Sequence, residues 1–293
     1  MFYKAFGLNI CSDLALPELT PGGHGADLRI RVGELAKPHV EPTSIRRGGI
    51  EASFGGTSRA AYLHWPGVVS VLAENGCTLT VSPADGVVPQ LLNQFLLSEA
   101  LGLVLYQRGF FLLHASAVDI GGRGIVLAGA PGVGKSTTAA ALARRGRAVL
   151  SDDMVVLDLK GEEVLIQPGF DNVKVWPETA AALGYEASAL PEIFPNSAKR
   201  LVRNKGTFAI TPLPLRSIYF LEAGPELIFK RLTGMHAFIP LLRFFPCPSA
   251  LLEAPAFEYH RQCQDLCGRV PIMQVQVPRN LDLIGDLLDG LAR

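Results

Sequence analysis

The sequence lacks any apolar run long enough to cross a membrane, and it has no excess of charge of either sign. Its most apolar stretch, residues 91–118, is interrupted by polar side chains, among them Asn93, Glu99, Gln107, Arg108 and His114, so no uninterrupted run reaches the roughly 18 to 20 residues of a membrane span. Lys plus Arg and Asp plus Glu number 27 each, which gives a formal net charge of zero. A neutral chain has no overall field to hold nucleic acid or an anionic membrane, and we expect neither as a partner.

Cysteine is also scarce, and its pattern argues against a disulfide framework. The five cysteines are an odd number at scattered positions. His260, Cys263 and Cys267 share the spacing of one helix face, but only the distant Cys247 would complete a zinc site, which favours packing over metal binding. The N-terminus has a single lysine, Lys4, before its first acid and no small-residue cleavage site. We therefore expect a soluble cytoplasmic protein with reduced thiols.

What is present is apolar mass for a packed core. Hydrophobic residues make up 48% of the 293 residues and charged residues 18%, which excludes a disordered chain and suggests two domains of about 150 residues each. Short, partly alternating segments punctuated by glycine and proline predict a mostly antiparallel β domain over residues 1–88. A mixture of helices and strands predicts an α/β domain over residues 89–293.

Several individual elements follow from periodicity and turn residues. Asn75-Gly76 between two apolar runs predicts a hairpin, because both residues tolerate positive φ. The remaining segments are predicted as strands 5–10, 27–32, 60–65, 68–72 and 78–81, a helix 90–107 ending at Gly109, a strand 110–120, a strand 124–128, a helix 135–145, a strand 148–151, a hairpin 154–159 with 164–167, a strand 273–277 and a C-terminal helix.

The strongest motif is a complete G-x-x-x-x-G-K-S phosphate loop, with an apolar strand before it and a helix after it. Its glycines allow the backbone to turn successive N–H groups toward phosphate oxygens, and the following helix directs its positive end at the same anion. Lys135 supplies charge to the β and γ phosphates, and Ser136 is placed to ligate magnesium. The predicted ATP-binding residues are Gly129, Ala130, Pro131, Gly132, Val133, Gly134, Lys135, Ser136 and Thr137.

Two adjacent acids, Asp152 and Asp153, follow the predicted strand 148–151. Buried carboxylates are costly unless a positive partner meets them, and magnesium at the phosphate loop is the obvious one. Because neighbouring side chains on a strand point to opposite faces, we expect the roles to divide: one carboxylate holds magnesium and the other accepts a proton. The residues alone do not say which acid does which. Two solvated acids at a turn are the alternative.

Two further groups have both a structural and a catalytic interpretation. His114 lies on the strand before the loop, where a histidine is more often a core residue than a catalyst. Lys199, Arg200, Arg203 and Lys205 form a basic cluster in this neutral chain. Lys199 or Arg200 could neutralise charge on a transferring phosphoryl group, whereas Arg203 and Lys205 fit a solvated surface.

The stretch from His114 to Asp153 resembles HPr kinase/phosphorylase, a bacterial protein-serine kinase with a phosphate loop. The shared features are a strand histidine, the loop 129–136, a short helix ending at Arg145-Gly146, and the Asp152-Asp153 pair. The resemblance implies catalytic roles for His114, Lys135 and Asp153, with Asp153 as the proton acceptor and Ser136 on magnesium. It also implies the α/β core shared with phosphoenolpyruvate carboxykinase.

The N-terminal part is closer to the HPr-kinase-like proteins of ribosomal-peptide pathways, lasso peptides included, whose substrate is a serine of a precursor peptide. The segment E-x-R-G-x-G of the bifunctional enzyme is absent, and residues 168–178 stand in its place. That departure speaks against the reverse reaction and leaves Glu178 as a candidate second metal ligand beside Asp152.

The sequence therefore predicts an ATP- and magnesium-dependent kinase acting on a serine hydroxyl in a protein or peptide, with a homo-oligomer as one candidate assembly. A small-molecule kinase on the same core is one alternative. A nucleotide-gated binding or scaffold protein without catalysis is the other. Neither an N-K-x-D guanine motif nor an L-S-G-G-Q signature is present, so a switch GTPase and a transporter are less favoured.

Overall fold

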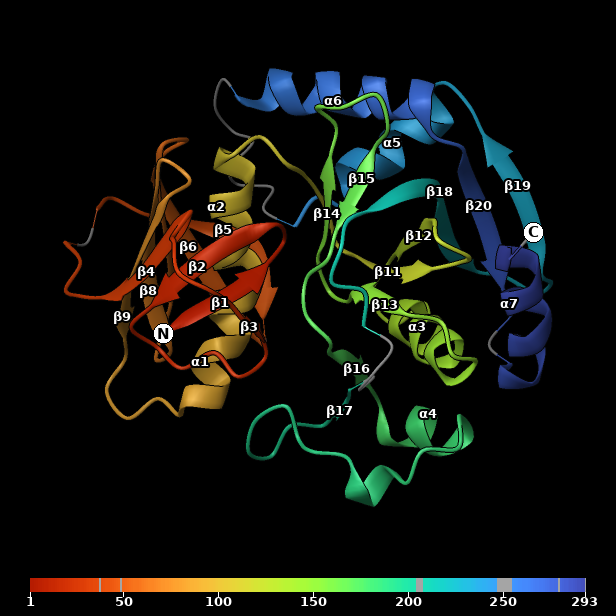
Figure 1. The fold of residues 1–293 in the computed structure, drawn as a ribbon, viewed down its shortest axis with the longest axis horizontal. Helices are drawn as coiled ribbons and strands as arrows, with labels where there is room; N and C mark the ends of the chain where they lie inside the picture. Colours follow the sequence, from red (N-terminus) through yellow and green to blue (C-terminus); the bar gives the residue numbers. More distant parts are fainter. Residues whose placement is uncertain (37, 48, 204–207, 247–254, 279, 293) are drawn as a thin grey trace. The chain divides into compact units, whose positions relative to one another are not determined.

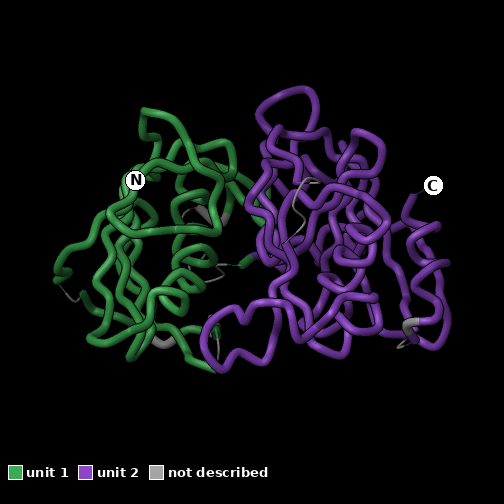
Figure 2. Tube along the Cα trace, turned by 60° about the horizontal axis from the view of Figure 1, so that its bottom comes forward, with its two compact units in different colours: residues 1–112, 246–261 green, residues 113–245, 262–293 purple. Residues whose placement is uncertain are grey.

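The computed structural model describes residues 1–293 apart from 37, 48, 204–207, 247–254, 279 and 293 (Figure 1). It divides into two compact units, one of residues 1–112 with 246–261 and one of residues 113–245 with 262–293 (Figure 2). The helical segment of residues 89–107 groups with the first unit, because its second helix packs on strands of that unit. The division into two independent domains at residue 88 stays a prediction.

The first unit is built on a nine-stranded sheet with the order β3-β1-β2-β4-β9-β8-β7-β6-β5. Among its described residues the neighbouring strands are antiparallel, apart from the parallel pairs β2–β4 and β4–β9. The strands are β1 (Phe2–Ala5), β2 (Leu8–Ser12), β3 (Thr20–Pro21), β4 (Leu28–Val32), β5 (Glu41–Arg47), β6 (Ile50–Thr57), β7 (Ala60–Trp65), β8 (Val69–Glu74) and β9 (Thr78–Pro83).

Turn residues decide where these strands end. The predicted hairpin at Asn75-Gly76 is confirmed, with φ of +51° and +68° between the antiparallel strands β8 and β9. The single strand predicted over residues 5–10 is wrong, because Phe6 and Gly7 take φ of +52° and +74° and close a hairpin between β1 and β2. The Phe6 side chain is fully buried, so the apolar run supplies a core residue at the turn itself.

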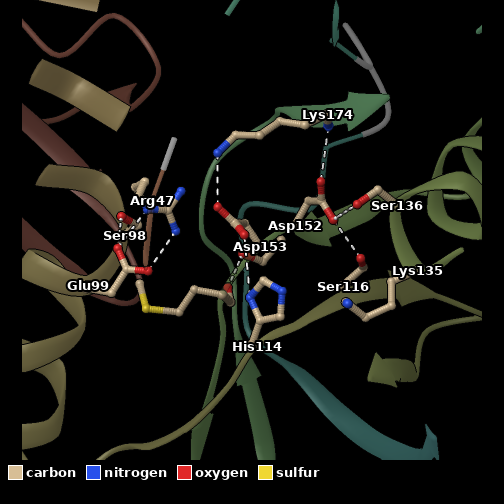
Figure 3. Close-up of polar contacts among 12 residues, drawn as sticks. Arg47, Ser98, Glu99, His114, Ser116, Lys135, Ser136, Asp152, Asp153 and Lys174 are labelled. Atoms are coloured by element: carbon tan, nitrogen blue, oxygen red, sulfur yellow. Dashed lines mark hydrogen bonds and ion pairs between the residues drawn. The ribbon is translucent and has the colours of Figure 1, made fainter. Parts of the chain in front are cut away.

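The helix predicted over residues 90–107 forms as α1 (Pro89–Phe95), a π-helical turn η1 (Leu96–Ala100) and α2 (Leu101–Gln107), and Gly109 follows with φ of +82°. The irregular turn contains Glu99, which is buried. Arg47 meets this carboxylate through two hydrogen bonds of 2.7 and 2.9 Å, and the Ser98 hydroxyl donates to it at 2.6 Å (Figure 3). These donors, one of them charged, satisfy an acid that would otherwise be costly to bury.

The second unit contains a mixed sheet with the order β10-β14-β15-β18-β12-β11-β13, in which β20 also pairs with β18 and β19. The long central strand β18 runs parallel to β12 and to β20, which confirms the predicted α/β class. The strand predicted over 110–120 is interrupted at His114. The strands are β10 (Phe111–Leu113), β11 (Ala115–Asp119), β12 (Gly124–Gly129), β13 (Val149–Ser151), β14 (Val155–Asp158), β15 (Leu165–Gln167), β18 (Leu213–Ala223), β19 (Ile228–Leu232) and β20 (Ile272–Val277).

Helices and a two-stranded ribbon complete this unit. Helix α3 packs on β11 and β12, and its alanine-rich face shares one core with the ribbon and α7. The described residues contain no helix long and apolar enough to span a membrane. The remaining elements are α3 (Lys135–Arg144), β16 (Val173–Val175), α4 (Pro177–Ala182), η2 (Ala187–Ala189), β17 (Arg200–Val202), α5 (Met235–Arg243), α6 (Pro255–Arg269), η4 (Leu281–Leu283) and α7 (Ile284–Ala292).

Candidate active site

The glycine-rich loop joins β12 to α3, as the motif predicts. Gly129, Gly132 and Gly134 have φ of +144°, +79° and +111°, which L-amino acids with a side chain rarely adopt. At Gly129 a Cβ atom would also lie 2.5 Å from the carbonyl oxygen of Leu221 on β18. The loop therefore depends on its glycines for both conformation and space, and it leads directly into the positive end of α3.

Lys135, the first residue of α3, is buried against this loop with 8% of its surface exposed. Its ammonium group donates to the carbonyl oxygens of Gly129 at 2.8 Å and Ala130 at 3.2 Å. Burial lowers the pKa of Lys135 from its usual range, while the nearby carboxylates of Asp152 and Asp153 act in the opposite direction. The loop thus encloses a cation that two acids stabilise.

Asp152 follows the last residue of β13 and is 3% exposed. One oxygen, Oδ1, accepts hydrogen bonds from the hydroxyls of Ser116 at 2.6 Å and Ser136 at 3.0 Å. The other, Oδ2, accepts the backbone N–H of Lys174 at 3.1 Å. Three donors hold this carboxylate beside the loop serine. A buried carboxylate and a hydroxyl are the hard oxygen ligands that Mg²⁺ prefers, so this pair fits the predicted metal.

Asp153 points away from that pair, toward His114 and Lys174 (Figure 3). Its Oδ2 accepts a hydrogen bond from the Lys174 ammonium group at 3.0 Å, and its Oδ1 lies 3.5 Å from Nδ1 of His114. The backbone of Asp153 has φ of +75°, an uncommon conformation for a residue with a side chain. The adjacent acids therefore have separate surroundings, one set at the loop serine and one at the histidine.

A cavity of about 700 Å³ opens beside the glycine-rich loop. Its walls come from residues 130–134 of the loop, the end of β18, α5 and the segment from η4 into α7. Most of the lining is apolar, while Glu222, His236 and Arg243 contribute charged or polar groups. A volume of this size accommodates a compound as large as a nucleotide, with its phosphates at the loop.

Arg200 and Lys199, two residues of the basic cluster, contact side chains outside the acid pair. The Arg200 guanidinium group contacts the Glu192 carboxylate at 3.4 Å and donates to the Ser197 carbonyl at 2.8 Å. The Lys199 ammonium group lies 5.3 Å from the ring centre of Trp176 and is close enough to Lys135 to lower that residue's pKa further. Direct action of either residue on a phosphoryl group stays a prediction.

Metal binding by Glu178 stays a prediction. Glu178 lies exposed on the first turn of α4. Cys263 is fully buried in α6, as packing predicts, and the described residues contain no group of three or more His, Cys, Asp or Glu that could hold a metal. Cys247, the fourth zinc ligand considered, lies outside the described residues, as does Lys205 of the basic cluster.

Two residues of the site were missed from the sequence. Ser116 comes two positions after His114 in an otherwise apolar strand, and this lone hydroxyl was the available signal. Lys174 follows Asp152 by 22 residues, and the sequence gives no sign that its backbone and side chain reach the two acids.

A glycine-rich strand–loop–helix unit with a divided acid pair is the arrangement expected of a phosphate-binding α/β core. Comparison with known proteins finds a more specific similarity. Residues 110–174 match the family model of the HPr serine kinase C-terminal domain. This segment contains His114, Ser116, the whole loop, both acids and Lys174. The chain is therefore HPr kinase-like over the part that builds the site, which confirms the resemblance.

Individual relatives match over part of this chain. HPr kinase/phosphorylase of Chlorobium phaeobacteroides (strain BS1) is 34% identical over 103 residues, which is 35% of this chain and 26% of the relative. The protein of that name from Prosthecochloris aestuarii is 48% identical over 56 residues, or 19% of this chain and 16% of the relative. The chain thus covers about a quarter or less of these two relatives' lengths.

A solved structure of the HPr(Ser) kinase/phosphatase from Coxiella burnetii aligns with 61% of this chain and 94% of its own. The TM-score is 0.32 and the sequence identity 12%. The family relationship accordingly depends on the sequence match over residues 110–174.

Proposed function

We propose that this protein is an ATP- and magnesium-dependent kinase that transfers the γ-phosphoryl group to a serine hydroxyl of a peptide or small protein. The observation that carries the proposal is the division of the acid pair. Asp152 faces the loop serine Ser136, where a metal would be held, and Asp153 faces His114, where a proton acceptor is needed. The names of the relatives, which describe protein kinases with phosphorylase activity, agree with this assignment.

The chemistry needs little beyond positioning and charge neutralisation. The acceptor hydroxyl loses its proton to the Asp153 carboxylate as its oxygen bonds to the γ-phosphorus, and the bond from that phosphorus to the bridging oxygen of ADP breaks. Lys135 and the loop amides stabilise negative charge on the phosphates. Magnesium, which Ser136 and Asp152 would hold, supplies further neutralisation of the same oxygens. His114 would orient Asp153 or the acceptor.

The acceptor class and the core type remain part of the proposal. The resemblance to HPr-kinase-like proteins of lasso and other ribosomal-peptide pathways favours a serine in a precursor peptide. The same resemblance favours a core of the HPr kinase/phosphoenolpyruvate carboxykinase type. Residues 168–178, which replace the glycine-rich segment of the bifunctional enzyme, favour transfer in the forward direction only.

The experiment is to incubate the protein with labelled Mg-ATP and panels of serine peptides, HPr-like proteins and small metabolites. We expect acceptor-dependent ADP release with a peptide or protein, and a mass increase on its serine. Asp153→Asn should abolish transfer but leave nucleotide affinity nearly unchanged, because the Asp153 carboxylate faces His114 and Lys174, whereas Asp152 is the acid bonded to the loop serine.

Other results would replace the proposal. Label on a metabolite would indicate a small-molecule kinase, and ATP binding without acceptor-dependent ADP release would indicate a binding protein. Transfer at the full rate by Asp153→Asn would show that another group accepts the proton. Absence of binding heat with millimolar Mg-ATP would reject the nucleotide site itself.

A further inference from the structure

We propose that Lys174 is a positioning residue for phosphoryl transfer, holding Asp153 in place through its ammonium group. The inference rests on the proposed function, because it assigns Lys174 a role at the same site. Its evidence is local geometry: Nζ donates to Asp153 Oδ2 at 3.0 Å, and the side chain is only 16% exposed. A partly buried charge-assisted hydrogen bond is stronger and more directional than an exposed ion pair.

The backbone of Lys174 has a separate function from its side chain. Its N–H group donates to Asp152 Oδ2 at 3.1 Å. Because every non-proline residue has this N–H, substitution of the side chain should leave Asp152 held while releasing Asp153. Lys174 thus offers a way to perturb one acid without the other.

The strand that carries Lys174 is well fixed. Its neighbours Val173 and Val175 are buried in the core that includes α3, and Lys174 pairs with Leu201 on β17. Successive side chains of a strand point to opposite faces, so the valines anchor β16 while the lysine faces the acids. A change of the lysine side chain alone should therefore leave the ribbon in place.

Asp153 needs external fixation because of its backbone. Its φ of +75° lies in the left-handed region, which residues with a Cβ atom adopt infrequently. Such conformations persist where surrounding contacts determine them. Lys174 holds Oδ2 at 3.0 Å, whereas His114 approaches Oδ1 at 3.5 Å. The Lys174 bond is the shorter of these two contacts.

The other lysine of the site does not duplicate this function. Lys135 directs its ammonium group to the carbonyl oxygens of Gly129 and Ala130. Charge neutralisation at the phosphates and orientation of the proton acceptor are thus divided between Lys135 and Lys174. Lys174 forms and breaks no covalent bond in the transfer. It keeps the Asp153 carboxylate oriented while that group takes the hydroxyl proton.

The test compares wild type with Lys174→Met, which keeps the length of the side chain but not its charge, and with Lys174→Arg, which keeps the charge. Lys230→Met is the matched control, because Lys230 lies exposed on β19. We measure kcat and KM from acceptor-dependent ADP release, and nucleotide affinity by calorimetry. Thermal unfolding verifies that each variant is folded.

For Lys174→Met we expect a fall in kcat of about 10- to 100-fold, since misplacing a catalytic group by an ångström has effects of this order. Nucleotide affinity should stay within about threefold of wild type, because Asp152 and the loop keep their contacts. Lys174→Arg should recover most of the rate, and Lys230→Met should match wild type. This split between kcat and nucleotide binding, together with rescue by arginine, is not expected of a residue that only stabilises the fold.

A kcat for Lys174→Met within about twofold of wild type overturns the inference while leaving the kinase proposal intact. Equal loss of nucleotide binding and thermal stability in Lys174→Met and Lys174→Arg also overturns it, in favour of a structural role. A wild-type protein that binds Mg-ATP but transfers to no acceptor rejects the proposed function, and this inference with it.

Discussion

The Ser116 hydroxyl offers a quantitative test of the buried acid. Ser116 is fully buried, and its hydroxyl donates to Asp152 Oδ1 at 2.6 Å. Ser116→Ala removes this bond but leaves Asp152 with Ser136 and the Lys174 N–H as donors. A hydrogen bond to a charged group contributes about 1.5–3 kcal/mol. Although the carboxylate keeps two donors, the bond is fully buried, so we expect a loss near the middle of that range, about 2 kcal/mol.

Ser151→Ala provides the matched control. The Ser151 hydroxyl is equally buried and donates at the same 2.6 Å, but its acceptor is the neutral carbonyl of Met154. A neutral bond contributes about 0.5–1.5 kcal/mol, so Ser116→Ala should be the more destabilising by roughly 1 kcal/mol. Urea unfolding of both variants beside wild type measures this difference.

A double-mutant cycle with Asp152→Asn isolates the effect of charge. An asparagine can keep its oxygen toward the Lys174 N–H and turn its amide nitrogen toward the two serine hydroxyls, which can rotate to accept. The bond to residue 116 then becomes neutral, and Ser116→Ala should cost about 1 kcal/mol less in that background. Equal costs of Ser116→Ala and Ser151→Ala, or a coupling of zero, would refute the reasoning.

Two further changes test the loop and the cysteines. Gly129→Ala should weaken Mg-ATP binding at least tenfold by calorimetry, roughly the effect of 1.4 kcal/mol, because the new Cβ would meet the Leu221 carbonyl at 2.5 Å. Gly161→Ala in the β14–β15 turn is the control. An unchanged affinity for Gly129→Ala would contradict this account. Burial raises the pKa of the Cys263 thiol to about 12, whereas Cys77 is exposed. Iodoacetamide at about pH 8 should therefore modify Cys77 first, as measured by peptide mapping of the native protein. Equal rates of modification would show that Cys263 is accessible.

Local signals explain what could be predicted from the sequence. The phosphate loop was identifiable because three of its glycines take positive φ and the flanking strand and helix have clear periodicity. The hairpin at Asn75-Gly76 follows from the same preference. Phe6 shows the opposite case: a bulky residue takes φ of +52° because its ring fills the core, and no local preference indicates that.

The contacts of the site depend on long-range placement, which the sequence does not contain. Ser116 reaches an acid 36 residues later, and Lys174 reaches back 22 and 21 residues to the acid pair. His114 and both acids were singled out by the resemblance to HPr kinase/phosphorylase, which includes their spacing to the loop. Their partners depend on how β11, β13 and the β16–β17 ribbon assemble around α3.

The divided acid pair also shows how one strand end can serve two chemical purposes. Adjacent residues within a regular strand already point to opposite faces, yet β13 ends at Ser151, before both acids. The left-handed φ of Asp153 then directs the second carboxylate to the histidine, while the first stays at the loop serine. A cation held by Asp152 would lower the basicity of an acid sharing its surroundings. Separate partners for the two acids would let the proposed metal ligand and the proposed proton acceptor act at different positions.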